Sequence, residues 1–140
     1  MFCLDANVII GVMTRRKPAL DARLRLELQR GARLVVPVPV LFELRYGADK
    51  SEAKERNHAR IDDFLVAVPQ IASFDAEDAC EAAEIRAFLE SQGLPIGPFD
   101  YLIAAQARRR GAALVTLNRV EFDRIPGLLV TDWGGAERPT

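Results

Sequence analysis

The chain has 140 residues, of which 49% are apolar and 28% charged, and a net charge of −1 at pH 7. This length and apolar content predict one folded domain with a sizeable core. The near-neutral charge excludes a chain-wide basic surface, so any nucleic-acid contact must come from local patches. Cys3 and Cys80 lack metal-ligand spacing, and no apolar run approaches the roughly 18 residues of a membrane span. We expect a cytoplasmic protein without a targeting extension or a membrane contact.

The first half of the chain predicts two buried strands, each followed by helices. The first apolar run ends on Asp5, and the second is Leu34-Val35-Val36. Gly31 is expected to stop the helix that Pro18 opens, and Ser51 to cap the helix that ends before Pro69. In order, we expect a strand at 2–4, helices at 6–13 and 18–30, a strand at 34–36, and helices at 38–47 and 51–68.

The second half continues the alternation of strands and helices. Asp75 is expected to begin a long helix, and Pro98 opens another that ends at Gly111. One helical turn is expected at 118–123. The expected elements are a strand at 71–74, helices at 75–92 and 98–110, and strands at 113–117 and 128–130. We assign residues 1–133 to a single domain and expect 134–140 to form a mobile C-terminal tail.

The clearest predicted strands are uniformly apolar rather than alternating, which is typical of strands buried on both faces. Alternation with helices therefore predicts an α/β fold with a mostly parallel sheet covered on both faces. In such open sheets, binding sites form outside the carboxyl ends of the strands, where the strand order reverses. Asp5 and Asn118 each follow a strand, and Glu43 lies in the first turns of the helix after the second strand.

Each of three acidic residues has an ordinary structural explanation when it is taken alone. Asp5 could cap the helix that follows it, and Asp100 could complement the dipole of the helix opened by Pro98. Glu43 is harder to explain, because apolar residues precede it and the helix dipole weakens at that depth. Asp100 shares a stripe with Ile103, so it too points toward the core.

A shared site explains the three acids together. Three carboxylates that converge without a cation repel one another, and a divalent metal removes that repulsion. The available ligands are oxygens, which suit Mg²⁺ or Mn²⁺, whereas zinc would favour His or Cys. The only histidine, His58, lies in a charged helix where we expect it to be solvated. Mg²⁺ bound by few carboxylates is typical of sites that act on phosphates, so the acids predict phosphodiester chemistry.

A fourth polar group is expected close to the end of the strand at 113–117. Thr116, Asn118 and Glu121 are the candidates, with a turn or cap as the alternative for Asn118 and a surface position for Glu121. Positive charge that could contact phosphates occurs in two local clusters. The cluster Arg15, Arg16 and Lys17 lies in a loop and is the candidate for phosphate contacts. The basic residues at 108–110 are better explained as the charges that a helix C-terminus favours.

An ordered set of motifs resembles the PIN-domain ribonucleases, most closely the VapC-like toxins of bacterial type II toxin–antitoxin pairs. The resemblance covers nearly the whole chain. It rests on Leu4-Asp5-Ala6-Asn7, Phe42 to Gly47, Phe99 to Ala105, Thr116-Leu117-Asn118 with Glu121-Phe122, and Ile125 to Trp133.

This resemblance implies a three-layer α/β/α sandwich and an RNA substrate. It implies that Asp5, Glu43 and Asp100 bind metal and act in catalysis, with Glu121 or Asn118 as the fourth member of the site. The usual Asp-Thr-Asn opening is Asp5-Ala6-Asn7 here, so Asn7 is retained as a supporting residue while a hydroxyl is missing. An antitoxin protein is the implied partner. We expect it to place an amphipathic segment in a groove between Pro18 and Phe64, and we also expect a homodimer.

Three other classes of protein share part of this pattern. A receiver domain needs paired acids after the first strand and a late lysine, and a dehalogenase-type phosphatase needs Asp-x-Asp where this chain has Asn7. A non-catalytic PIN-like module that binds RNA or protein is supported by Asn118 and opposed by the three retained acids. Nothing in the residues identifies the RNA target.

Overall fold

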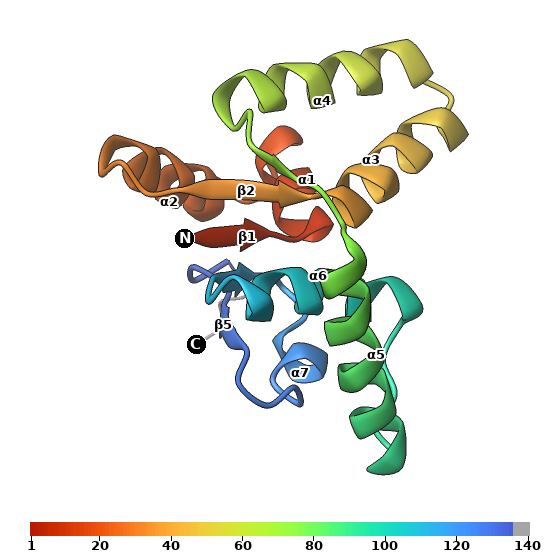
Figure 1. Cartoon of the computed structure of the whole chain (residues 1–140). Helices are drawn as coiled ribbons and strands as arrows, with labels where there is room; N and C mark the ends of the chain where they lie inside the picture. Colours follow the sequence, from red (N-terminus) through yellow and green to blue (C-terminus); the bar gives the residue numbers. More distant parts are fainter. Residues whose placement is uncertain (136–140) are drawn as a thin grey trace.

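The computed structural model describes residues 1–135, which form five strands and seven helices. All strand pairs are parallel, and the order across the sheet is β3-β2-β1-β4-β5 (Figure 1). The elements are β1 (Phe2–Leu4), α1 (Ala6–Met13), α2 (Pro18–Gln29), β2 (Leu34–Pro37), α3 (Val38–Lys50), α4 (Lys54–Ala67), β3 (Ile71–Ala72), α5 (Ala76–Ser91), α6 (Pro98–Arg109), β4 (Ala113–Val115), α7 (Arg119–Phe122) and β5 (Leu129–Thr131). The predicted α/β fold with a parallel sheet is confirmed.

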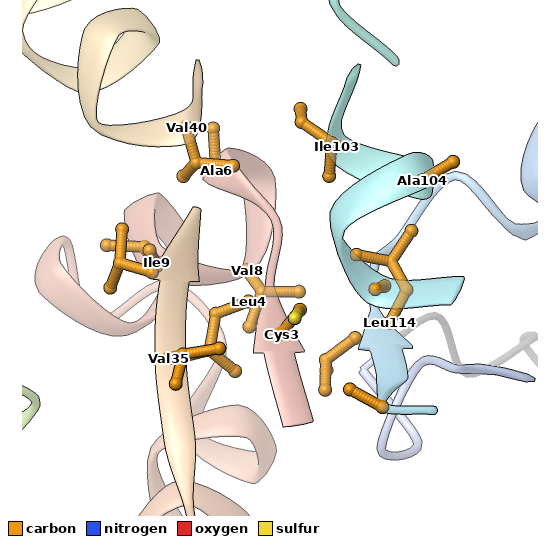
Figure 2. Packing of buried hydrophobic residues seen from close by; sticks show 14 of the residues in the cluster. Cys3, Leu4, Ala6, Val8, Ile9, Val35, Val40, Ile103, Ala104 and Leu114 are labelled. Atoms are coloured by element: carbon orange, nitrogen blue, oxygen red, sulfur yellow. The ribbon is translucent and has the colours of Figure 1, made fainter. Parts of the chain in front are cut away.

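The core lies on both faces of the three central strands. Cys3 of β1 lies in register with Val35 of β2 and Leu114 of β4, and Figure 2 shows these side chains with Ile9 of α1 to one side and Ile103 of α6 to the other. Helix α6 contributes Ala104, which is fully buried, so that its backbone can approach β1 and β4 closely. No helix of residues 1–135 has both the length and the apolar character needed to cross a membrane.

The sheet has one point where the strand order reverses, between β1 and β4. From β1 the chain moves outward to β2 and β3, and it then returns through α5 and α6 to β4 on the other side of β1. β1 and β4 stay paired to their carboxyl ends, and the connections that adjoin them lead to opposite sides of the sheet, which is where open α/β sheets bind ligands. Asp5 directly follows β1, and Thr116 directly follows β4.

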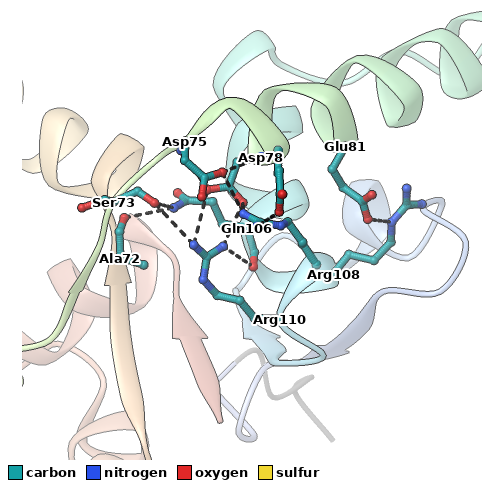
Figure 3. Close-up of polar contacts among 10 residues, drawn as sticks. Ala72, Ser73, Asp75, Asp78, Glu81, Gln106, Arg108 and Arg110 are labelled. Carbon is teal, nitrogen blue, oxygen red and sulfur yellow. Dashed lines mark hydrogen bonds and ion pairs between the residues drawn. The ribbon is translucent and has the colours of Figure 1, made fainter.

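A polar cluster fastens α5 to the C-terminal end of α6 (Figure 3). Asp78 is fully buried, and its Oδ1 accepts hydrogen bonds from Arg109 and Arg110 at 2.9 and 3.0 Å. Gln106 Nε2 donates to the carbonyls of Ala72 and Ser73 at 3.0 and 3.1 Å, which ties α6 to the end of β3. Arg108 pairs with Glu81 of α5, so all three arginines that end α6 are bound within the fold.

Several local expectations differ from the structure. Ser51 does not cap α4, which begins at Lys54; it ends α3 instead, where its Oγ donates to Ala48 O and accepts from Asn57 Nδ2. The expectation of a solvated His58 is also wrong, since its Nε2 lies 2.7 Å from Asp49 Oδ1 and its Nδ1 3.0 Å from Arg45 Nη1. The expected strands at 71–74 and 113–117 end at Ala72 and Val115.

The segment predicted to be a mobile tail falls mostly outside the described residues, which stop before position 136. Within the described part, Gly135 is buried and lies against Leu20 and Leu117, so closely that a Cβ atom would collide with the Leu20 side chain.

Candidate active site

Asp5 uses its two carboxylate oxygens for different purposes. Oδ1 accepts a hydrogen bond from the backbone N–H of Ala6 at 2.8 Å, which caps α1 as the sequence suggested. Oδ2 accepts from Thr116 Oγ1 at 2.8 Å, a contact between the ends of β1 and β4. The residue is only 6% exposed. Burial raises the pKa of Asp5, and the hydrogen bonds from Thr116 and Ala6 oppose that shift.

Thr116 and Asn7 join the segments that follow β1 and β4. Thr116 is fully buried, and its Oγ1 accepts from the backbone N–H of Asn118 at 3.1 Å while it donates to Asp5. Asn7 Oδ1 accepts from the backbone N–H of Leu117 at 3.2 Å. The hydroxyl that Ala6 cannot supply therefore comes from Thr116, which is 111 residues from Asp5 in the chain.

Glu43 and Asp100 come from helices that pack against each other, α3 and α6. Burial raises the pKa of Glu43 to about 7, with further contributions from the negative charges of Asp5 and Asp100. Burial likewise raises the pKa of Asp100 to about 6, helped by the charges of Asp5 and Glu121 and opposed by a hydrogen bond to the Gly97 backbone. The charge of Asp5 thus reaches Glu43 and Asp100, and the charge of Glu121 reaches Asp100.

Glu121 joins the group through Asn118. The side-chain amide of Asn118 donates to Glu121 Oε2 at 2.9 Å, from the position directly before α7. Sequence reasoning left these two residues as competing candidates for the fourth member of the site. The structure places them in contact, with the carboxylate on Glu121 and its hydrogen-bond donor on Asn118.

The donor set fits a divalent metal ion bound by oxygen. Glu43 Oε1 is buried without a hydrogen-bond partner among the described residues. The pKa values of Glu43 and Asp100 are raised first by burial and then by neighbouring negative charges, and a bound cation would offset both effects. In residues 1–135, no set of three or more His, Cys, Asp or Glu side chains is drawn together closely enough to hold a metal ion by itself. The acids are therefore neighbours whose carboxylates are not drawn into a closed cage.

The predicted basic contacts lie elsewhere. Arg15, Arg16 and Lys17 are exposed in the loop between α1 and α2, and Arg15 borders a pocket of about 540 Å³ with Asp21 and Asp63 instead of the four acids. A role of this loop in RNA binding stays a prediction.

Sequence reasoning missed three exposed aromatic residues next to the acids. Phe42, Tyr46 and Phe99 line one pocket of about 570 Å³ with Glu43 and Asp100. A signal was present, because a phenylalanine directly precedes both acids, in Phe42-Glu43 and Phe99-Asp100.

Comparison with known proteins identifies the family. A family model described as PIN domain matches residues 2–128. The chain belongs to the PIN-domain family. A tRNA(fMet)-specific endonuclease VapC of Shigella flexneri is 43% identical over 94% of this chain and 97% of that relative. One of the same name from Salmonella typhimurium is 37% identical with the same coverage.

A solved structure agrees with the sequence relatives. VapBC2 from Rickettsia felis, bound to a DNA fragment from its promoter, contains a chain that matches with a TM-score of 0.87 and 35% identity over 93% of this chain and 96% of that one. The chain described here is accordingly a PIN-domain nuclease of the VapC type, and the resemblance drawn from its motifs is confirmed. The receiver-domain and dehalogenase alternatives are excluded. PIN-domain ribonucleases generally use divalent metal ions, which agrees with the oxygen donors found here.

Proposed function

We propose that the chain is a Mg²⁺- or Mn²⁺-dependent endoribonuclease that hydrolyses RNA phosphodiester bonds, and that it is the toxin of a type II toxin–antitoxin pair. The observation that carries the proposal is that Asp5, Glu43 and Asp100 meet at the strand reversal, with Glu121 close enough for its charge to act on Asp100. Burial raises the pKa of Asp5, Glu43 and Asp100, and the charges of neighbouring acids raise those of Glu43 and Asp100 further. Hard oxygen donors in this number suit Mg²⁺ or Mn²⁺ and do not suit zinc.

The residues have separable tasks in this proposal. Asp5, Glu43 and Asp100 would hold the cation, and Glu121 would add a fourth negative charge beside Asp100. The cation supplies charge stabilisation at the phosphate and a more acidic water. Thr116 fixes the orientation of the Asp5 carboxylate through its hydrogen bond. Glu43 Oε1 has no hydrogen-bond partner among the described residues, so its lone pairs would be available to the cation.

Transfer RNA is the substrate class that we propose to test first. The Shigella and Salmonella relatives are both named tRNA(fMet)-specific endonucleases. Support comes from their identity to this chain along almost its whole length.

An antitoxin is the proposed protein partner. A pocket of about 240 Å³ between α1, α3 and α4 is lined by apolar side chains that include Ile10, Met13 and Ile61, and Glu43 lies at its border. An amphipathic segment could fill the apolar part while a basic side chain reaches Glu43. The Rickettsia felis relative was solved as a VapBC2 complex. A homodimer and a cytoplasmic location belong to the same proposal.

The competing proposal is a PIN-like module that binds RNA or protein without catalysis. Asn118 favours it, because an acid is common at that position in the family. The hydrogen bond from Asn118 to Glu121 weakens it, since a carboxylate is delivered to the same place.

A cleavage assay separates the two proposals. The purified chain is incubated with tRNA(fMet), an elongator tRNA and an unstructured RNA, each with Mg²⁺, with Mn²⁺ and with a chelator. We expect cleavage that needs the metal and is fastest on tRNA(fMet). Binding without cleavage under every metal condition would favour the non-catalytic module. Equal cleavage of the three RNAs would keep the nuclease and reject the tRNA preference.

A further inference from the structure

Three aromatic side chains form an exposed row beside the acids. Phe42 is 52% exposed, Tyr46 57% and Phe99 44%, although large apolar side chains normally avoid water. Phe42 and Tyr46 are four residues apart on α3 and so share a helix face, while Phe99 lies in the first turn of α6. A contiguous exposed apolar patch marks an interaction site more often than isolated exposed residues do.

The three rings lie next to one another in nearly parallel orientations. The centroids of Phe42 and Phe99 are 5.3 Å apart with an interplanar angle of 29°, and those of Phe42 and Tyr46 are 6.3 Å apart with an angle of 11°. At the outer end, Lys50 Nζ lies 5.8 Å from the centre of the Tyr46 ring. The row therefore runs from Asp100 and Glu43, past Phe99 and Phe42, to an aromatic ring with a cation above it.

We infer that Phe99, Phe42 and Tyr46 form a stacking platform for the bases of single-stranded RNA next to the bond that is cut, and that Lys50 contacts the backbone phosphate beyond them. Proteins that bind single strands combine aromatic rings, on which bases stack, with positive charge that follows the backbone. The platform and the acids share one pocket of about 570 Å³, so a strand with its phosphate at the acids passes directly over the rings. This inference rests on the proposed ribonuclease function and adds residues that position the substrate.

The sequence explains why an aromatic ring lies next to each of two acids. Phe42 precedes Glu43, and Phe99 precedes Asp100, so each helix turns an acid inward and the neighbouring ring outward. In the proposed complex, these two dipeptides fix how far a stacked RNA base lies from the phosphate held at the acids.

The test compares Phe42→Leu, Phe99→Leu and Tyr46→Leu with wild type in steady-state cleavage of a single-stranded RNA. Phe88→Leu is the matched control, because Phe88 is a similarly exposed phenylalanine on α5 with no ring beside it among the described aromatic pairs. We expect the KM for RNA to rise about 5- to 100-fold in Phe42→Leu and Phe99→Leu, and to rise more than kcat falls, which corresponds to the loss of one stacked base. Phe99→Tyr should restore the wild-type KM, and Phe88→Leu should not change it.

A second arm removes the base instead of the ring. An RNA with an abasic nucleotide at one position near the cut should raise the KM of wild type as much as the ring variants do, and should add nothing further in Phe42→Leu or Phe99→Leu. An unchanged KM in the variants, or losses that simply add, would overturn the inference. So would a change from dimer to monomer in the variants with an unaltered KM, because the rings would then be a protein interface. Wild type that cleaves no RNA would refute the proposed function and this inference with it, whereas active variants with normal KM refute the platform alone.

Discussion

Asp5 shows how one residue can satisfy two explanations that compete when only the sequence is considered. Its Oδ1 caps α1 and its Oδ2 is held by Thr116, so the capping contact leaves the second oxygen available to a site. An Asn at position 5 could still cap the helix. It would replace one carboxylate oxygen by an amide NH₂ group and would remove one negative charge from the group of acids.

Gly97 is the residue whose size the site limits most directly. Its φ of −62° is ordinary for any residue, but a Cβ atom there would lie 2.9 Å from Asp100 Oδ2. Gly97→Ala should therefore displace the Asp100 carboxylate and lower cleavage, with a stability change below about 1 kcal/mol because only a helix cap is altered. RNA cleavage and urea unfolding measure the two effects.

Gly47→Ala is the control for that change. Gly47 lies in α3, and a Cβ atom at this position would meet nothing within 4 Å, so alanine should leave cleavage unchanged and stabilise the helix by about 0.5–1 kcal/mol. Wild-type cleavage by Gly97→Ala would mean that the position of Asp100 does not matter.

Glu43 should give the metal-free protein a characteristic dependence on pH. Its pKa of about 7 in the folded state exceeds the ordinary value of 4.5, so the folded chain holds the extra proton between those pH values. The contribution of Glu43 to the free energy of unfolding should be greatest below about pH 4.5 and should fall as pH rises toward 7. Thermal melts of wild type in chelator, from about pH 5 to about pH 8, should show a falling Tm.

Glu43→Gln should flatten this profile without removing it, because Asp100, with a pKa of about 6, contributes in the same direction. A variant profile as steep as that of wild type would show that Glu43 is not the group under strain.

At the scale of elements, a buried polar cluster joins α5 to the C-terminal end of α6, the helix that carries Asp100 in its first turn. Asp78 is fully buried and accepts hydrogen bonds from Arg109 and Arg110, and with Asp75 it forms the capping box of α5. Burial acts to raise the pKa of Asp78, but the hydrogen bonds from Arg110 and Arg109 hold it below its usual value.

Asp78→Ala should destabilise the fold by about 3–5 kcal/mol, because it leaves two arginines without their shared partner. Urea unfolding at neutral pH measures this loss. Glu77→Ala is the control, since Glu77 pairs with the same Arg109 but is 78% exposed, and its loss should cost less than about 1 kcal/mol. Equal losses of stability in Asp78→Ala and Glu77→Ala would show that the burial of Asp78 does not strengthen its pairing with the arginines.

Much of this arrangement of elements could be predicted from the sequence, and the reasons are physical. Uniformly apolar runs such as Leu34-Val35-Val36 are typical of strands covered on both faces, so the parallel sheet followed from them. Proline at the start of α3 and α6, and Asp75 at the start of α5, marked helix beginnings that the structure retains. The prediction that Ser51 caps α4 was wrong because its hydroxyl had two possible partners. It donates a hydrogen bond to the Ala48 carbonyl of α3, which precedes it in the chain, and does not cap α4.

The site was only partly predictable, because its geometry depends on contacts between distant segments. Asp5 could be placed from the strand that precedes it. Asp100 follows the loop at 93–97, and its position depends on how α6 packs against α5 and β4. The bond from Thr116 to Asp5 and the bond from Asn118 to Glu121 are tertiary contacts that no local pattern encodes.

At the scale of the whole molecule, the fold brings together four acids that begin far apart in the sequence. Their shared location at the strand reversal follows from the crossing of the chain between β3 and β4. Without a cation this arrangement costs stability, as the raised pKa values of Glu43 and Asp100 indicate. Mg²⁺ or Mn²⁺ should therefore raise the Tm of wild type, because a ligand bound only by the folded state stabilises it.

The most direct test of the central claim, that the acids form one metal-dependent nuclease site, is RNA cleavage by Asp100→Asn with Mg²⁺ or Mn²⁺, paired with melts of the same protein. This nearly isosteric variant should be at least as stable as wild type without metal, since one repelling charge is gone. It should also lose both the metal-induced rise in Tm and at least about 100-fold of the cleavage rate. Cleavage at the wild-type rate by Asp100→Asn would contradict the account.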